Sequence, residues 1–247
     1  MTRAIILAAG QGRRLLPLTA DRPKCLLQVA GRLLLEWQVD HLLAAGIADV
    51  TVVTGFRTDA VEALVASRWG GRGVQTLFNP FFEAADNLAS CWLASGCMSG
   101  DFLLLNGDTL FEAAVLDRLL RSPPAPITLT IDRKDSYDDD DMKVQLEGTR
   151  VRHVSKTLPH DQVQAESIGM LYFRGDGPEL FRMAIESAMR HTTSLRLWYL
   201  STIDALAGRG YVQPCAITGL RWAEIDFPDD LARADALFAD GAREARR

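Results

Sequence analysis

The sequence predicts an α/β protein in which helices cover both faces of a mostly parallel sheet, a three-layer α/β/α arrangement. Apolar runs alternate with helical patterns over residues 1 to 108, which is typical of a parallel sheet with crossover helices. Polar clusters follow the apolar runs at 10–14, 79–87 and 106–109. Ligands of such sheets bind beyond the carboxyl ends of the strands, so we expect the functional site at these clusters.

The first half of the chain supplies the sheet and its covering helices in order. Short apolar or β-branched runs predict buried strands at 4–9, 50–55, 74–78 and 101–108. Apolar residues at helical spacing predict helices at 33–46, 58–69 and 87–98. The first of these helices ends at Gly46, a residue type common just after a helix.

A proline-rich connection at 121–126 marks a change of pattern. Consecutive strands are expected at 127–133, 142–148, 149–156 and 165–174. The turn at 146–151 predicts a hairpin, which either adds antiparallel strands to the same sheet or forms a small antiparallel lid. Later patterns predict helices at 177–190 and 198–207, strands at 211–218 and 222–227, and a helix from Pro228. We expect one domain over 1–247, with a first half at 1–110 and a second half at 111–247 that completes the sheet.

Composition excludes several function classes. Lys and Arg total 27 against 32 Asp and Glu, and no basic stripe with interleaved aromatic residues occurs, so nucleic acid is not an expected partner. The chain shows no leader pattern and no apolar run of about 18 residues, so we expect no membrane association and a cytoplasmic location. Cys25, Cys91, Cys97 and Cys215 form no CxxC pair, which favours reduced thiols and gives no zinc signature.

The loop after the first strand carries the strongest functional signal. Its sequence, LAAGQGRRLLPLTADRPKCLL, fails the dinucleotide pattern GxGxxG because Leu15 stands at the third glycine position, and it lacks the Lys-Ser or Lys-Thr of a P-loop. Gly10 and Gly12 allow backbone N–H groups to face an anion, while Arg13 and Lys24 supply positive charge. The loop therefore predicts a site for a phosphorylated ligand.

The spacing of Gly10, Gly12, Arg13, Pro17, Pro23 and Lys24 resembles the signature of the nucleotidyltransferases that activate sugar phosphates and small alcohol phosphates. That resemblance implies a Rossmann-like nucleotidyltransferase fold with a nucleotide-binding first half and an acceptor-binding second half. The segment LLLNGDTLF resembles the family's metal-binding segment, and WAEIDFPDDL resembles its late element. By resemblance Asp108 and Asp226 are ligands of Mg²⁺, which prefers hard oxygen donors. Taken alone, each aspartate is equally compatible with a turn or cap.

The segment NPFFEAADNLASCWLA resembles the cytidylyltransferases that act on phosphocholine, inositol phosphate and phosphonates. The resemblance implies a pyrimidine reader between Asn79 and Ser90, with Asn87 as the base contact. Asn87 is equally compatible with a helix N-cap. The expected nucleotide-binding residues are Leu7, Ala8, Ala9, Gly10, Gly12, Asn79, Asn87, Ser90 and Asp108.

The segments YDDDDMKVQLEGTRVRHVSKTL and AESIGMLYF resemble the phosphocholine and phosphonate branch. By that resemblance Lys156 binds the phosphate or phosphonate of the acceptor, and Glu166 lies at its far end. A carboxylate with aromatic neighbours suits a cationic head group, and Tyr137, Trp198 and Tyr199 are the aromatic candidates. Three alternatives stay open: Glu166 forms a structural salt bridge, the aromatic residues are core, and the run 138–141 is a solvated turn.

The resemblance thus implies a CTP-dependent cytidylyltransferase that couples CMP to phosphocholine, 2-aminoethylphosphonate or a similar acceptor and releases pyrophosphate. Arg13, Lys24 and Lys156 are its expected catalytic residues, Mg²⁺ its cofactor, CTP and the acceptor its ligands, and a homodimer its possible assembly. Two alternatives are a nucleotidyltransferase for a sugar 1-phosphate or inositol 1-phosphate, and a noncatalytic nucleotide-sensing subunit. Retention of Arg13, Lys24, Asp108 and Asp226 together argues against the last.

Overall fold

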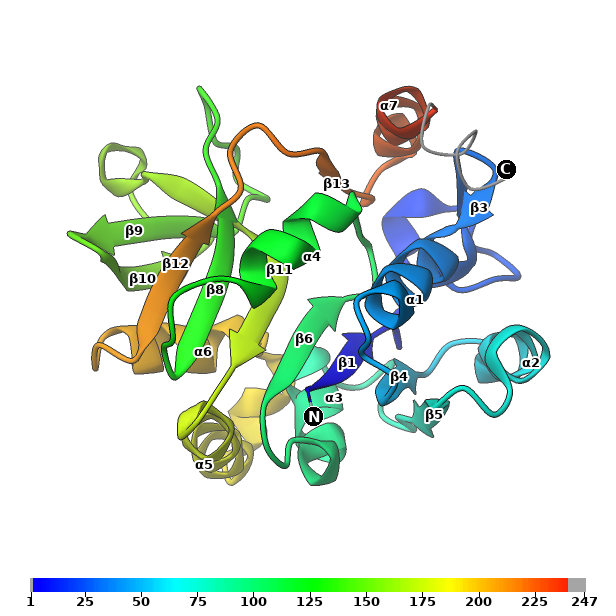
Figure 1. Cartoon of the computed structure of the whole chain (residues 1–247), viewed down its shortest axis with the longest axis horizontal. Helices are drawn as coiled ribbons and strands as arrows, with labels where there is room; N and C mark the ends of the chain where they lie inside the picture. The colour runs from blue at the N-terminus through cyan, green and yellow to red at the C-terminus, as the bar shows by residue number, and fades with distance from the viewer. Residues whose placement is uncertain (1, 240–247) are drawn as a thin grey trace.

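The computed structural model describes residues 2–239 and has the predicted three-layer α/β/α arrangement (Figure 1). Among these residues, nine strands form one sheet in the order β10-β9-β11-β6-β1-β4-β5, with β8 beside β11 and β12 beside β8. The strands are β1 Arg3–Leu7, β4 Val50–Thr54, β5 Val74–Phe78, β6 Phe102–Asn106, β8 Ile127–Asp132, β9 Lys143–Glu147, β10 Arg150–Ser155, β11 Ala165–Phe173 and β12 Val212–Ala216.

The sheet is parallel where the first half of the chain builds it and mixed beyond. β1 pairs in parallel with β4 and β6, and β4 pairs in parallel with β5. β11 then enters antiparallel to β6, and β12 lies parallel to β8. The β9–β10 hairpin pairs with the start of β11, so it extends the main sheet, the first of the two arrangements expected from the sequence.

A break in the register of β11 lets this strand pair with several neighbouring strands. Ala165 and Glu166 pair with β9, whereas Met170 to Phe173 pair with β6. The pairing with β8 shifts between Ser167 and Leu171, where Gly169 has a φ of 72°. A Cβ at Gly169 would lie 2.4 Å from Nδ2 of Asn106, so glycine leaves the room that the Asn106 side chain occupies at the end of β6.

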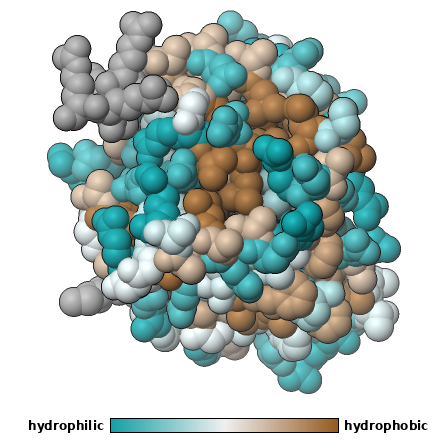
Figure 2. Space-filling model, turned by 90° about the vertical axis from the view of Figure 1, so that its right-hand side faces the viewer, coloured by the Kyte–Doolittle hydropathy of each residue, from teal (hydrophilic) through white to brown (hydrophobic). Residues whose placement is uncertain are grey.

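Two apolar cores cover the two faces of the sheet. One contains side chains of α1, α2 and α4, and the other contains side chains of α3, α5 and α6. The helices are α1 Leu34–Ala44, α2 Thr58–Trp69, α3 Asn87–Leu93, α4 Ala113–Leu120, α5 Gly177–Met189, α6 Leu200–Ala207 and α7 Pro228–Phe238. Seen from the side of α2 and β3, apolar side chains gather at the centre of the surface and polar ones surround them (Figure 2).

A smaller layer joins the end of the chain to the middle of the sheet. β13 (Trp222–Glu224) pairs antiparallel with β7 (Thr109–Phe111), and α7 packs above them against β2 (Gln28–Val29) and β3 (Arg32–Leu33). A third apolar cluster, which includes Trp37, Leu110 and Phe238, holds these pieces together. The layer therefore places the segment around Asp226 beside the end of β6.

The sequence did not predict α4 or the short strands β2, β3 and β7, whereas β13 lies within the strand expected at 222–227. Val115, Leu116 and Leu119 are buried at helical spacing and were a usable signal for α4. β2, β3 and β7 are two or three residues long, which is too short for a hydrophobic pattern to be detected in the sequence. The remaining helices are single 3₁₀ turns, which are η1 Arg13–Leu15, η2 Lys24–Leu26, η3 Ala94–Cys97, η4 His160–Gln162 and η5 Thr192–Arg196.

Candidate active site

Three segments far apart in the sequence meet at the carboxyl edge of the sheet: the loop after β1, the turn after β6 and the residues after β13. The backbone N–H of Gly107 donates to the carbonyl of Leu7 at 2.9 Å, and that of Ile225 donates to the carbonyl of Asp108 at 3.2 Å. Asp108 and Asp226 are thereby brought together, as expected from the ends of neighbouring strands.

The loop after β1 folds around Lys24. Gly12 has a φ of 76°, and a Cβ on it would lie 3.0 Å from the Cβ of Lys24, so both the left-handed backbone and the close approach favour glycine. The hydroxyl of Thr19 donates to the carbonyl of Gly12 at 2.8 Å and fixes the loop. Gly10, by contrast, has a negative-φ conformation with no atom near its Cβ direction. The cradle therefore depends on Gly12 rather than on both glycines.

Lys24 is the cation at the centre of the site. Its Nζ lies 2.7 Å from Oδ2 of Asp108 and 2.5 Å from Oδ1 of Asp226. Burial disfavours the charged ammonium, but the negative charges of the two aspartates outweigh that effect and raise the pKa of Lys24. Burial also opposes ionisation of Asp226, yet Lys24 and Arg14 lower its pKa below the ordinary value. Lys24 therefore stays charged between two carboxylates.

Arg14, which the sequence analysis did not single out, is the arginine that reaches this centre. Its guanidinium lies 2.7 Å from Oδ2 of Asp226 and 3.1 Å from Oδ2 of Asp140. Arg13 points elsewhere, into a small depression that it lines with Gln11, Phe82 and Glu83, and it forms no ion pair with any described residue. Two adjacent arginines cannot be told apart by spacing alone, which is why the sequence did not single out Arg14.

Glu224 is a second residue that the sequence analysis missed. Oxygen atoms of Asp108, Glu224 and Asp226 lie within 4.8 Å of one another. By accessible surface Glu224 is an exposed residue. Desolvation of its carboxyl group, together with the negative charges of Asp108 and Asp226, raises its pKa to about 8. The available signal was the strand expected at 222–227, whose alternation would place residues 224 and 226 on one side.

These three carboxylates fit a magnesium ion. All donors are hard oxygens, and Oδ1 of Asp108 is buried with no hydrogen-bond partner among the described residues. A buried acceptor without a partner is costly, and a cation would supply the missing interaction. The donor set and this open oxygen therefore support Asp108 and Asp226 as magnesium ligands, with Glu224 as a third carboxylate at the same place.

Two clefts open on either side of the carboxylates. The first has a volume of about 240 Å³, and its lining includes six of the residues predicted from the sequence, which are Leu7, Ala9, Gly10, Asn87, Ser90 and Asp108. Trp198, predicted at the acceptor, also lines this cleft. Ala8, Gly12 and Asn79 are not among the lining residues.

Asn79 and Asn87 have different places. Asn79 is 1% exposed; its Nδ2 donates to the hydroxyl of Ser90 at 3.0 Å and its Oδ1 accepts from the N–H of Phe81 at 2.8 Å. Asn79 therefore orients Ser90 and does not itself face the cleft. Asn87 is the first residue of α3, and Asp86 holds the N-cap position, so the N-cap interpretation of Asn87 is wrong. Its Oδ1 instead accepts from the backbone N–H of Tyr199 at 2.9 Å.

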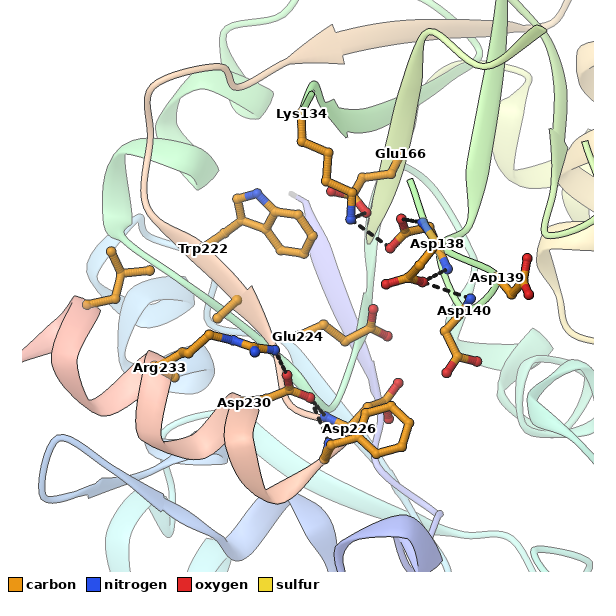
Figure 3. A pocket seen from close by; sticks show the side chains of 15 residues that line it. Lys134, Asp138, Asp139, Asp140, Glu166, Trp222, Glu224, Asp226, Asp230 and Arg233 are labelled. Carbon is orange, nitrogen blue, oxygen red and sulfur yellow. Dashed lines mark hydrogen bonds and ion pairs between the residues drawn. The ribbon is translucent and has the colours of Figure 1, made fainter. Parts of the chain in front are cut away.

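The second cleft, of about 650 Å³, is acidic. Figure 3 shows Lys134, Glu166 and the loop with Asp138 to Asp140 on one wall, and Trp222, Glu224 and Asp226 on another. Within the loop, the Asp138 carboxylate accepts from the N–H groups of residues 140 and 141 at 2.9 and 3.1 Å. The run 138–141 is thus a hydrogen-bonded turn, the alternative left open by the sequence, and it also lines a cleft.

Lys156 stands where the two clefts approach each other. Its Nζ lies 4.7 Å from the ring centroid of Trp198, within cation–π range, and 3.4 Å from Oδ1 of Asp140. Trp198 lines the first cleft and Asp140 lines the second. Lys156 therefore contacts one residue from each.

Glu166 already has a cationic partner inside the protein. Nζ of Lys134 lies 2.9 Å from Oε2 of Glu166 and 2.8 Å from Oδ1 of Asp141. Burial raises the pKa of Glu166 to about 7, although Lys134 opposes that rise. The Nζ of Lys134 also lies 5.7 Å from the ring centroid of Tyr137. The structural salt bridge, one of the alternatives left open by the sequence, is therefore present.

Two further expectations concern the chain as a whole. In the part of the chain that the structure describes, no helix has both the length and the apolar character needed to cross a membrane. Cys25, Cys91, Cys97 and Cys215 are all free thiols, as the absence of a paired pattern predicted.

Comparisons with known proteins show what the chain is similar to. The chain is 31% identical to a CMP-5'-(3-aminopropyl)phosphonate synthase of Streptomyces rubellomurinus, over 99% of this chain and 40% of the relative. The chain spans about half, or less, of the length of the first curated relatives it matches.

Two solved structures have the same fold. An inositol-1-phosphate CTP transferase from T. maritima aligns with a TM-score of 0.82 and 22% identity, covering 99% of this chain and 97% of that one. A CTP:phosphocholine cytidylyltransferase from Streptococcus pneumoniae aligns with a TM-score of 0.79 and 21% identity, covering 96% of this chain and 99% of that one. The family model for the MobA-like NTP transferase domain matches residues 4–168, which include the loop after β1, Lys24, Asp108 and Lys156. The chain belongs to the MobA-like NTP transferase family.

Proposed function

We propose that this protein transfers CMP from CTP to a small phosphate or phosphonate acceptor with a cationic head group, and releases pyrophosphate. The observation that carries the proposal is the cluster of Lys24, Asp108, Glu224 and Asp226 between two clefts of different chemistry. Two of the similar proteins are a CMP-phosphonate synthase and a phosphocholine cytidylyltransferase, and their functions support this choice of donor and acceptor.

The first cleft suits the nucleotide. Gly10 and the amide and hydroxyl groups of Asn87 and Ser90 line it and offer contacts for a triphosphate and a pyrimidine. Lys24 adds positive charge beside Asp108, another of its lining residues. Asn79 would act on the base only through Ser90, whose hydroxyl it binds. Arg13 lies beside this cleft near Phe82 and is placed to meet the outer phosphates.

The second cleft suits the acceptor's head group. Asp138 and Asp139 supply negative charge, and Trp222 supplies an aromatic face that a desolvated cation favours. Lys156 stands between the clefts and is the residue placed to bind the acceptor's anionic end. Glu166 and Tyr137 reach the head group only together with Lys134, whose ammonium both contact.

The reaction needs charge control rather than a base. An ionised oxygen of the acceptor attacks the α-phosphorus of CTP, a new P–O bond forms, and the bond to the bridging oxygen breaks, so that pyrophosphate leaves with its electron pair. Lys24 and Lys156 offset the repulsion between the two anions. Mg²⁺ held by Asp108 and Asp226 would neutralise charge on the triphosphate. Among the described residues, no Ser-His-Asp or Cys-His arrangement lies at the site, and this reaction requires none.

Pyrophosphate release with a panel of substrates tests the proposal. Each of CTP, UTP, ATP and GTP is combined with phosphocholine, 2-aminoethylphosphonate, inositol 1-phosphate and a hexose 1-phosphate. We expect CTP to exceed ATP and GTP by at least about tenfold in kcat/KM, because a site that hydrogen-bonds one base leaves polar groups unpaired with another. Equal use of purine nucleotides would overturn the cytidylyl assignment. Turnover only with inositol 1-phosphate or the hexose 1-phosphate, whose head groups carry no positive charge, would overturn the assignment of a cationic acceptor.

The location and assembly of the protein also remain predictions. We propose a cytoplasmic enzyme, since its four described cysteines are free thiols, which persist in a reducing compartment. The homodimer expected from the family is tested by light scattering of the purified protein.

A further inference from the structure

Gln38 is a buried polar residue of α1 that no step above uses. It is 1% exposed, and its Nε2 donates to two backbone carbonyls, that of Asn106 at 2.7 Å and that of Thr109 at 2.8 Å. These two carbonyls flank Gly107 and Asp108. Both N–H donors of the Gln38 amide thus bind the turn that carries the Asp108 carboxylate.

The turn has few other anchors of this kind. On one side the N–H of Gly107 donates to the carbonyl of Leu7, and on the other the carbonyl of Asp108 accepts from the N–H of Ile225. A Cβ at residue 107 would lie 2.7 Å from the carbonyl oxygen of Leu7, so the turn lies directly against β1. Gln38 holds it from the third side, through α1. The amide therefore completes a set of contacts that fixes where the Asp108 carboxylate points.

The other atom of the amide shows that packing alone does not explain this residue. Oε1 of Gln38 is buried with no hydrogen-bond partner among the described residues. An unpaired buried acceptor lowers stability, and an apolar side chain of similar size would avoid that cost. What an apolar residue would lose is the pair of N–H donors to the turn.

We propose that Gln38 is a positioning residue that sets the Asp108 carboxylate relative to Lys24 and Asp226, and thereby sets the affinity of the site for a divalent cation. The inference rests on the proposed function only in taking Asp108 as a metal ligand. When residues that orient the metal ligands without binding the metal are replaced, metal affinity or activity changes by about 10-fold to 100-fold.

The test is Gln38→Met, which keeps the length of the side chain and removes both donors. Mn²⁺ affinity is measured by electron paramagnetic resonance, with and without CTP, so that no turnover is required. We expect Mn²⁺ to bind at least about tenfold more weakly, and the Mg²⁺ concentration for half-maximal pyrophosphate release to rise by a similar factor. Gln38→Asn, which is one methylene too short for both bonds, should shift both values in the same direction if Gln38→Met does not fold.

Trp37→Phe is the matched control. The neighbouring residue of the same helix also donates a buried hydrogen bond to a backbone carbonyl, that of Val29 at 3.0 Å, but Val29 is not part of the turn. The control should lower the melting temperature and leave Mn²⁺ affinity unchanged.

The outcomes separate the possible failures. A folded Gln38→Met protein with Mn²⁺ affinity within about twofold of wild type would show that Gln38 is only structural, and absence of Mn²⁺ binding in wild type would overturn the inference as well. If wild type binds Mn²⁺ and Gln38→Met weakens that binding, but no substrate pair releases pyrophosphate, the proposed function fails while the role of Gln38 stands.

Discussion

Asp108 and Asp226 share the ammonium of Lys24, at 2.7 and 2.5 Å, and this sharing makes each aspartate sensitive to loss of charge. An asparagine at either position keeps the shape of the side chain but removes a negative charge from the place where the triphosphate and its cation would be held. The two residues are therefore the most direct test of the site at the scale of single atoms.

We expect Asp108→Asn and Asp226→Asn each to reduce turnover by at least about a hundredfold, the scale seen when a group that stabilises charge in a transition state is removed. Pyrophosphate release at saturating Mg²⁺ measures this effect. Asp229→Asn is the matched control, because Asp229 is exposed in the first turn of α7 and has no described side-chain partner. Near-normal turnover in either aspartate variant would remove that residue from the metal site.

Glu166 predicts a pH dependence of stability. Its pKa in the folded protein is about 7, above the ordinary value of 4.5, because the carboxyl is buried. The folded state therefore binds the proton of the Glu166 carboxyl more tightly than the unfolded chain does. The contribution of this proton to the free energy of unfolding is present in full below about pH 4.5 and is lost as the pH rises through 7. In Glu166→Gln this dependence should disappear. The difference in unfolding free energy between wild type and variant should fall by roughly 1–2 kcal/mol from pH 5 to pH 8.

Urea titrations at the two pH values measure that difference. KM values for CTP and for a cationic acceptor, taken on the same variant, separate the two roles of Glu166. A tenfold rise of the acceptor KM alone would add the head-group contact to the salt bridge with Lys134, whereas unchanged KM values would leave only the salt bridge. An equal difference in unfolding free energy at pH 5 and pH 8 would contradict the raised pKa.

At the scale of elements, α1 combines a core face with a polar one. Leu35, Val39 and Leu42 pack into the core beneath the sheet, while His41 lies against the rings of Trp37 and Phe111 at centroid distances of 5.8 and 5.5 Å. Burial there, with the nearby charge of Arg32, lowers the pKa of His41 to about 4. Protonation of this imidazole therefore destabilises the packing of the helix.

We expect His41 to make the protein sensitive to acid. The unfolded chain binds the proton near pH 6.5 and the folded protein only near pH 4, so stability is present in full above about 6.5 and is lost as the pH falls between these values. His41→Phe should reduce the loss of unfolding free energy between pH 7 and pH 5 by about 1–2 kcal/mol. Urea titrations measure it, with the exposed His191→Gln as control. An unchanged pH dependence in His41→Phe would refute this assignment.

The elements also show what the sequence pattern does and does not determine. Buried strands such as β1 and β6 were predictable because four of the five residues in each are consecutive apolar residues, and α7 because Pro228 opens it. The contacts that make the site were not. Arg14 meets Asp140 across 126 positions of the chain and Gln38 meets Asn106 across 68, and neither separation leaves a local pattern. Family motifs supplied Asp108 and Asp226 in advance, whereas Glu224 needed the geometry of β13.

At the scale of the whole molecule, the two halves of the chain share one core. The cluster on the side of α3 contains Ile5 and Val53 from the first half and Ile127, Phe173 and Phe181 from the second. β11 pairs directly with β6 and joins the halves within the sheet. Neither half buries its own apolar surface without the other.

A single cooperative unfolding transition should result. Urea titrations followed by tryptophan fluorescence and by far-ultraviolet circular dichroism should give coincident curves, as a two-state transition requires. Two separated transitions would instead divide the chain near residue 110 and contradict the single domain predicted from the sequence.

The position of Lys24 has a practical consequence for handling the protein. Two carboxylates that face each other would repel and loosen the edge of the sheet, but here an ammonium lies between them and neutralises much of that repulsion. The fold thus carries its own counterion. A chelator such as EDTA should accordingly stop catalysis without lowering the melting temperature, and protein stored free of divalent ions should regain full activity when magnesium is returned.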